Sequence, residues 1–169
     1  MNTWTSESRK RIIEPQDLES KIAQLRAQGK TIATLNGSFD LLHAGHLFML
    51  FEASKVADIL LVAVNSDESV RKYKGEERPI ISLQYRLEML TALLFVDYVT
   101  WFDETTPCTL IRKVRPDIHV NGVEYGKNCV EKQAVDEVGA RLHLVERIPG
   151  LATSDVIEKI VSVCASSVQ

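Results

Sequence analysis

Apolar and polar positions follow two different periods along the chain, and these periods predict its secondary structure. Short apolar runs, of which residues 58–64 form the least interrupted, are typical of parallel strands covered on both faces. Strands are predicted over residues 31–35, 58–64, 97–101, 117–121 and 141–145. Between them, apolar residues recur three and four positions apart, which predicts helices over residues 14–29, 46–57, 82–96, 106–114, 129–138 and from about Thr153. This alternation predicts an α/β fold, a single-domain doubly wound parallel sheet of about five strands.

The domain is predicted to cover residues 14–169, because 169 residues suffice for one substantial core. Residues 1–13 are mostly polar around an isolated Trp4, which predicts an N-terminal arm outside the core. The three cysteines lie far apart and include no Cys-x-x-Cys pair, so no protein-bound metal site is predicted.

Charge and hydropathy narrow the classes of partner. The formal net charge of −3 argues against a broadly basic nucleic-acid surface. No apolar run reaches 18 residues, so no membrane partner is expected, and the polar start lacks the apolar centre of a signal peptide. A cytoplasmic location is therefore expected. Apolar residues 93–95 leave surface for a homodimer.

One stretch, residues 36–46 (NGSFDLLHAGH), carries the strongest chemical signal. It follows a predicted strand and precedes a predicted helix, where unpaired N–H groups favour an anion. Gly37 is expected to relax the backbone at the strand end, and Gly45 to let main-chain N–H groups approach a ligand. His43 and His46 add side-chain donors. The stretch therefore predicts a site for the phosphates of a nucleoside triphosphate.

Two further segments follow predicted strands. Residues 68–81 are dense in charge, and Lys72, Lys74 and Arg78 are placed to reach phosphates from the carboxyl end of the sheet; a solvated loop is the plainer interpretation. Thr153 and Ser154, at the start of the last predicted helix, offer hydroxyls and N–H groups to an anion, although helix capping alone would also explain them.

The stretch at residues 36–46 resembles the Gly-x-Phe-Asp-x-x-His-x-Gly-His signature of the cytidylyltransferase-like nucleotidyltransferases, whose fold is Rossmann-like. Arg147, Gly150, Thr153 and Ser154 are similar to a second phosphate-gripping motif of that family. Residues 64–79 and 95–99 look most like the heptose 1-phosphate adenylyltransferase domain. The resemblance implies transfer of a nucleoside monophosphate from ATP to heptose 1-phosphate with release of pyrophosphate, and Mg²⁺ bound with the triphosphate.

The resemblance also implies roles for individual residues. His43, His46 and Lys74 would be catalytic, and Asp40 and Arg78 would bind the acceptor, a sugar or alcohol phosphate. The nucleotide would be bound by Asn36, Gly37, Ser38, Phe39, His43, Gly45, His46, Lys72, Lys74, Asn121, Gly122, Arg147, Thr153 and Ser154.

Two positions depart from the family pattern. Ala152 stands where the family usually has Ser, and Asn121 stands where the heptose branch tends to have Lys. The signature is shared with glycerol-3-phosphate cytidylyltransferases, so CTP with glycerol phosphate stays open as an alternative. A non-enzymatic nucleotide sensor or scaffold with the same pocket is the second alternative.

Overall fold

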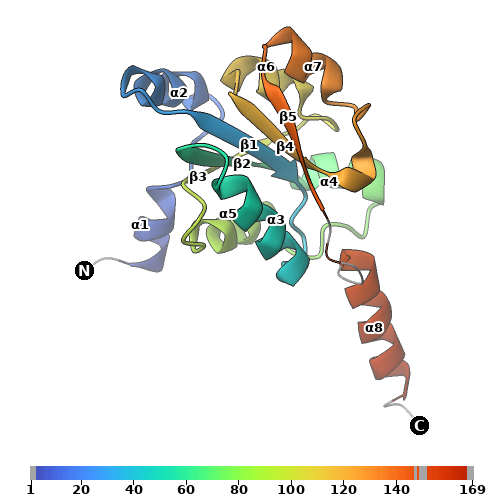
Figure 1. The fold of residues 1–169 in the computed structure, drawn as a ribbon. Coiled ribbons are helices and arrows are strands. Elements are labelled where there is room, and N and C mark those ends of the chain that lie inside the picture. Colours follow the sequence, from blue (N-terminus) through green and yellow to red (C-terminus); the bar gives the residue numbers. More distant parts are fainter. Residues whose placement is uncertain (1–2, 147, 149–151, 167–169) are drawn as a thin grey trace.

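The computed structural model describes residues 3–146, 148 and 152–166, which contain a five-stranded sheet in the order β3-β2-β1-β4-β5 (Figure 1). Every strand pairs in parallel with its neighbours. The strands are β1 (Ile32–Gly37), β2 (Ile59–Asn65), β3 (Tyr98–Phe102), β4 (Ile118–Gly122) and β5 (Arg141–Val145). The predicted doubly wound parallel sheet is confirmed.

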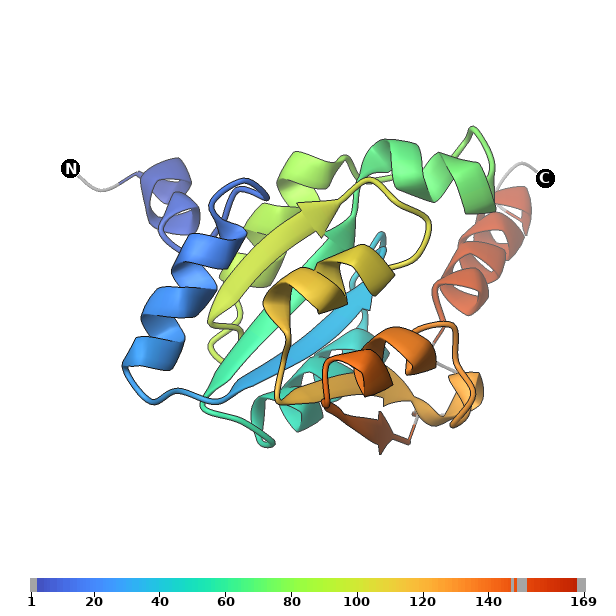
Figure 2. The same cartoon turned by 90° about the horizontal axis from the view of Figure 1, so that it is seen from above.

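Helices cover both faces of the sheet (Figures 1 and 2). They are α1 (Trp4–Arg9), α2 (Leu18–Ala27), α3 (Ala44–Ser54), α4 (Asp67–Lys74), α5 (Leu83–Thr91), α6 (Cys108–Val114), α7 (Lys132–Glu137) and α8 (Thr153–Ser166), with a short 3₁₀ turn η1 (Val123–Tyr125). Helices α3 and α5 pack on one face, whereas α2 and α6 pack on the other. Helix α8 points away from the sheet (Figure 1). Within the described residues, no helix has the length and apolar character needed to cross a bilayer.

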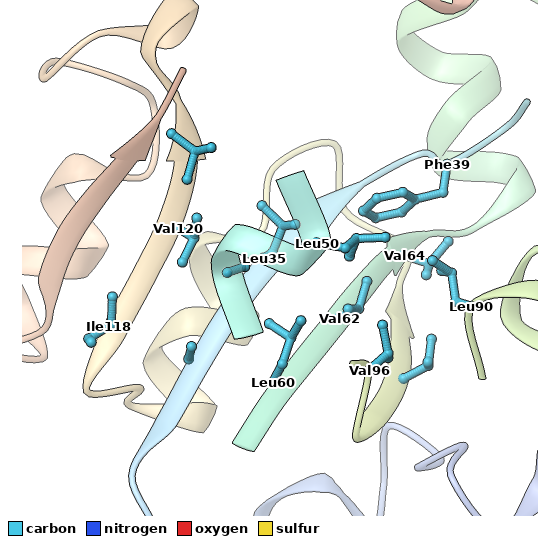
Figure 3. Packing of buried hydrophobic residues seen from close by; sticks show 14 of the residues in the cluster. Leu35, Phe39, Leu50, Leu60, Val62, Val64, Leu90, Val96, Ile118 and Val120 are labelled. Atoms are coloured by element: carbon cyan, nitrogen blue, oxygen red, sulfur yellow. The ribbon is translucent and has the colours of Figure 1, made fainter. Parts of the chain in front are cut away.

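The larger core cluster lies between the sheet and helices α3 and α5 (Figure 3). Leu35 is paired in register with Val62 on one side and Val120 on the other, and Leu50 and Leu90 from the two helices close over this face. Each such side chain contributes about 1.5–3 kcal/mol when it is fully buried. This packing anchors the strand from which the loop at residues 38–43 leaves.

Aspartates fix the amino-terminal edge of the sheet. The Asp58 carboxylate accepts the Thr31 N–H at 2.9 Å, that of Asp97 accepts the Leu60 N–H at 2.8 Å, and that of Asp117 accepts the Ile32 N–H at 2.8 Å. The predicted strands included these aspartates. In the structure, their side chains bond the start of a neighbouring strand, so β2, β3 and β4 each begin one residue later.

The last two residues of the predicted N-terminal arm are part of the domain. Ile13 is only 6% exposed and lies in the second core cluster. Ile12 forms a parallel bridge with Val99, and the Ile13 N–H donates to the Val99 carbonyl at 2.8 Å. The expectation that residues 1–13 lie outside the core therefore fails for these two, because they continue the sheet beyond the edge strand β3.

The charged segment after β2 begins with a helix, α4, where a loop was expected. The Ser66 hydroxyl accepts the Ser69 N–H at 3.2 Å as its N-cap. Acidic residues occupy the first turn and basic residues the last turn, as the helix dipole favours. The same charges that indicated a solvated loop thus stabilise a helix.

His119 predicts a pH-dependent loss of stability. Its side chain is 1% exposed, Nδ1 lies 2.9 Å from the Thr34 hydroxyl, and burial lowers the pKa of the imidazole from 6.5 to about 4. Between these pH values the unfolded chain binds more protons than the folded one, so stability falls as pH falls from about 6.5 towards 4, by about 3 kcal/mol in total.

Urea unfolding of the parent and of His119→Gln at pH 7.5 and pH 4.5 measures the pH-dependent contribution of His119 to the free energy of unfolding. The difference in unfolding free energy between the parent and the variant should be about 2–3 kcal/mol less favourable to the parent at pH 4.5 than at pH 7.5, because glutamine does not titrate. An equal margin at both pH values would contradict the assignment.

Candidate active site at the carboxyl edge of the sheet

A cavity of about 480 Å³ opens at the carboxyl ends of β1 and β4. The chain order of the strands reverses between these two, and open parallel sheets bind ligands at such a switch point. The cavity is lined by Leu35, Asn36, Gly37, Ser38, Phe39, His43, Gly45, His46, Met49, Lys74, Arg78, Asn121, Gly122, Glu124, Tyr125, Ala152, Thr153 and Ser154. Most of the residues predicted to bind the nucleotide therefore meet in one place.

The loop after β1 turns sharply at Phe39. Phe39 has φ 47°, a left-handed conformation that is costly for a residue with a side chain. Gly37 was expected to relax the backbone at the strand end, but its φ lies outside the left-handed region. A Cβ at Gly37 would lie 3.2 Å from Cε2 of the Phe39 ring. Gly37 thus makes room for the Phe39 ring, which is 4% exposed and packs into the core.

The two histidines stand at the start of α3. His43 is the N-cap, and its Nδ1 accepts the Gly45 N–H at 3.1 Å, which leaves the proton of a neutral imidazole on Nε2. The rings of His43 and His46 are stacked with their centroids 3.9 Å apart. Both side chains line the cavity at the positive end of the helix dipole. The arrangement offers imidazole donors to an anion.

Lys74, at the end of α4, reaches across to the loop after β1. Its Nζ donates to the Ser38 hydroxyl at 2.9 Å. Neighbouring groups displace part of the water around the Lys74 ammonium, and this loss of hydration, together with the nearby Arg78 guanidinium, lowers the pKa of Lys74. The residue as a whole remains exposed. A cation whose charge is disfavoured by its surroundings gains from an arriving anion. Lys74 is therefore a candidate for binding an anion in the cavity.

Lys72 does not reach the cavity. It forms an ion pair with Glu68 at 2.8 Å, four residues earlier on α4. Residues two apart on a helix point about 200° away from each other, so Lys72 and Lys74 face different directions. The prediction that both lysines bind phosphate assumed a loop, and the helix separates them.

Asp40 is buried behind the cavity. Its side chain has no exposed surface; it accepts the Ile80 N–H at 2.8 Å, the Ile81 N–H at 2.9 Å and Nε of Arg78 at 2.6 Å. Burial alone would raise the pKa of Asp40, but these hydrogen bonds and the Arg78 charge outweigh it and lower the pKa. Of the two predicted acceptor ligands, Arg78 lines the cavity, whereas Asp40 holds the loop in place.

The opposite wall follows β4. Asn121 is 8% exposed; its amide oxygen accepts the Gly122 N–H at 2.9 Å and its amide nitrogen donates to Glu131 at 3.3 Å. Gly122 lies under the Glu124 carboxylate, since a Cβ there would be 2.1 Å from a carboxylate oxygen.

Five cavity residues were not among the predicted site residues: Leu35, Met49, Glu124, Tyr125 and Ala152, the last of which had been noted only as a departure from the family pattern. Glu124 and Tyr125 follow the carboxyl end of a predicted strand, which was the available signal. Leu35 and Met49 belong to apolar patterns that indicate only core.

The start of α8 completes the cavity. Ala152, Thr153 and Ser154 line it, and the Asp155 carboxylate accepts the Ala152 N–H at 3.0 Å. The predicted second phosphate site therefore faces the first. Arg147, which was predicted to join this site, lies outside the described residues.

Two solved structures share this architecture. The lipopolysaccharide core biosynthesis protein from Thermoplasma volcanium GSS1 matches with a TM-score of 0.58 and 28% identity, over 71% of this chain and 98% of that one. A pantoate-beta-alanine ligase from Francisella tularensis, solved in complex with beta-gamma ATP and beta-alanine, matches with a TM-score of 0.60 over 88% of this chain and 72% of that one. At 15% identity, the second likeness concerns the fold.

Curated relatives share more sequence. The bifunctional protein HldE of Syntrophotalea carbinolica is 45% identical over 136 residues, which cover 80% of this chain and 28% of the relative. HldE of Wolinella succinogenes is 44% identical over 155 residues, covering 91% and 32%, and HldE of Campylobacter curvus is 47% identical over 142 residues, covering 83% and 29%. The chain thus spans about 30% of the length of these relatives.

A model of the cytidylyltransferase-like family matches residues 34–165, a range that runs from β1 into α8 and holds all the described cavity residues. The family recognised in the sequence is thereby confirmed: the chain belongs to the cytidylyltransferase-like family.

Proposed function

We propose that the chain is a nucleotidyltransferase that transfers AMP from ATP to heptose 1-phosphate, giving ADP-heptose and pyrophosphate. One observation carries this proposal. His43 and His46 at the start of α3, Lys74 at the end of α4 and the hydroxyls at the start of α8 all line one cavity at the switch point of the sheet. Donors from three helices around one space suit a chain of phosphates.

The proposed reaction needs donors more than a base. An oxygen of the acceptor's phosphate attacks the α-phosphorus, the bond from that phosphorus to the α–β bridging oxygen breaks, and pyrophosphate leaves with the electron pair. The attacking oxygen is already ionised at neutral pH, so no proton has to be removed. The protein holds the two anions in line and stabilises the charge that grows on the phosphoryl oxygens.

Each wall of the cavity takes one part of this task. His43 and His46 donate to the α-phosphate and the leaving oxygen. Lys74, at the end of α4, neutralises phosphate charge. Thr153 and Ser154 hold the β- and γ-phosphates. The resemblance assigns Arg147, outside the described residues, to the same task. Arg78 binds the acceptor's phosphate.

Mg²⁺ fits this site as an ion that arrives with the nucleotide. The described residues hold no group of three or more acidic, histidine or cysteine side chains arranged to bind a metal, and the cavity contributes the Glu124 carboxylate with amide and hydroxyl oxygens. Mg²⁺ commonly keeps several waters and binds substrate phosphates with one or two protein carboxylates. When bound, it neutralises charge on the phosphate oxygens.

The choice of heptose 1-phosphate has two supports. Residues 64–79 resemble the heptose 1-phosphate adenylyltransferase domain, and the relatives at 43–47% identity are named HldE, a protein that carries this domain. The proposal includes a cytoplasmic location, where nucleoside triphosphates are made, and a role in supplying activated heptose for lipopolysaccharide.

Pyrophosphate release tests the proposed function directly. ATP, CTP, GTP and UTP are each combined with heptose 1-phosphate or glycerol 3-phosphate in the presence of Mg²⁺. Release is expected with ATP and heptose 1-phosphate, and His46→Ala should lower it about 100- to 1000-fold because a transition-state donor is lost. Release only with CTP and glycerol 3-phosphate would replace the proposal with the cytidylyltransferase alternative. Nucleotide binding without release in any combination would indicate a sensor or scaffold.

The two lysines of α4 give a matched pair of variants. Lys74→Ala should lower kcat/KM by about 30-fold or more, because it removes a cation from the cavity. Lys72→Ala should stay within about threefold of the parent, because Lys72 pairs with Glu68 away from the cavity. Equal effects of the two variants in the pyrophosphate assay would refute the assignment.

We also propose that the chain forms a homodimer through apolar side chains outside the cavity. Leu94 is 93% exposed, and Phe51 of α3, 48% exposed, packs edge-on against the neighbouring Phe95 with centroids 5.7 Å apart. Light scattering should give about 38 kDa, twice the 19.0 kDa of one chain. Leu94→Glu should halve that mass without a change in circular dichroism, since the side chain makes little contact within its own chain. A monomer mass for the parent would end this proposal.

A further inference from the structure

Among the described residues, Arg86 of α5 is the largest side chain that is fully buried, with 0% exposure. A buried guanidinium is costly unless its donors are satisfied. Nε donates to the Ile81 carbonyl at 2.9 Å, one terminal nitrogen donates to the Ser38 carbonyl, and the other pairs with the Asp67 carboxylate at 2.7 Å. Arg86 does not line the cavity, so its guanidinium interacts with groups of the protein and not with a ligand there.

These contacts close a ring behind the loop after β1. Asp40 accepts the Ile81 N–H, the Ile81 carbonyl accepts from Arg86, and Arg86 donates to the Ser38 carbonyl, two residues before Asp40 in the chain. Because Asp40 and Arg86 have no exposed surface, solvent screens these bonds only weakly. The ring fixes Ser38, Phe39 and Asp40 from the side away from the cavity.

Asp67 extends the ring to the helix that carries Lys74. It is the first residue of α4, and its Oδ1 accepts both from Arg86 and from the N–H of Leu83, the first residue of α5, at 2.8 Å. One carboxylate oxygen therefore joins the starts of two helices to the buried guanidinium. Ser38 is held by Arg86 at its carbonyl and by Lys74 at its hydroxyl.

The ring also determines the direction of one backbone donor. In a trans peptide the C=O and N–H groups point in opposite directions. Since the Ser38 carbonyl points to Arg86, the Phe39 N–H points away from Arg86, and both Ser38 and Phe39 line the cavity. Phe39, which follows this peptide bond, has a left-handed φ of 47°.

We propose that Arg86 and Asp67 are positioning residues, which hold the Ser38–Phe39 peptide so that the Phe39 N–H is presented to a phosphate oxygen in the cavity. The effect on turnover rests on the proposed function, whereas presentation of the N–H does not. Neither residue touches substrate. Each acts through the loop, and the Asp67 contact keeps α4 and its Lys74 in register with that loop.

The experiment compares Arg86→Lys and Asp67→Asn with Arg11→Gln in the full-length chain. Arg11 is the matched control, because its guanidinium donates to the carbonyls of Thr91, Leu93 and Val96 at the far end of α5. Circular dichroism and thermal midpoints select a temperature at which every variant is folded. Asp67→Asn is the milder change, since Asp67 is 28% exposed and asparagine still offers an oxygen to the Leu83 N–H.

Two readouts then separate positioning from folding. Arg86→Lys and Asp67→Asn should lower kcat about 30-fold or more, with KM for ATP changed less than about threefold, whereas Arg11→Gln should leave both constants within about threefold. In ¹H–¹⁵N spectra, Mg·ATP should move the Phe39 amide proton downfield in the parent and in Arg11→Gln, and much less in the other two variants.

The outcomes separate the two proposals. Folded Arg86→Lys and Asp67→Asn proteins that match Arg11→Gln in both readouts would overturn the positioning role. If the parent releases no pyrophosphate with any acceptor, the proposed function fails, and the amide shift decides alone. A shift that is present in the parent and lost in the two variants then supports positioning, and no shift in the parent, or an equal shift in all proteins, overturns it.

Discussion

The conformation of the loop between β1 and α3 is the constraint on which the site depends. Phe39 holds a left-handed backbone there, a conformation that costs about 1–3 kcal/mol for such a residue and persists only where the surroundings impose it. Its ring lies in the core cluster of the sheet, and the next residue, Asp40, is held by three donors. Core packing and buried polar contacts together therefore set where the loop delivers His43 and the start of α3.

The sequence predicts the sheet well because each strand is covered on both faces. A strand in that position needs apolar side chains along its whole length, so runs such as residues 58–64 are diagnostic without any knowledge of their neighbours. The ends were less predictable. The predicted strands began at Asp58, Asp97 and Asp117. The carboxylates of these residues accept hydrogen bonds from backbone N–H groups that lie 27 to 85 residues away in the chain, and the local sequence carries no sign of those partners.

The location of the cavity could be predicted from the sequence more readily than the contacts that its residues make. Carboxyl ends of parallel strands meet at one edge, which brings together residues after β1 and β4. Arg86 gave no such signal, because an arginine in an amphipathic helix usually faces solvent, and its burial depends on Ser38 and Asp67 from remote segments. The separation of Lys72 from Lys74 was within reach, since the order of charges in α4 already favours a helix.

A formal net charge of −3 is compatible with an anion site because the site's field is local. Charges more than about 8 Å apart through solvent are largely screened at physiological salt, so the overall balance says little about one cavity. Asp40, the buried carboxylate closest in sequence to the histidines, would repel a triphosphate if it were unpaired, but Arg78 and two backbone N–H groups compensate its charge. The charged side chains that line the cavity are then Lys74, Arg78 and Glu124, and the N-terminal ends of α3 and α8 lie at the same cavity. Attraction for phosphate thus arises from the orientation of a few donors, and the buried ring behind the loop holds those of the loop after β1 and of α4.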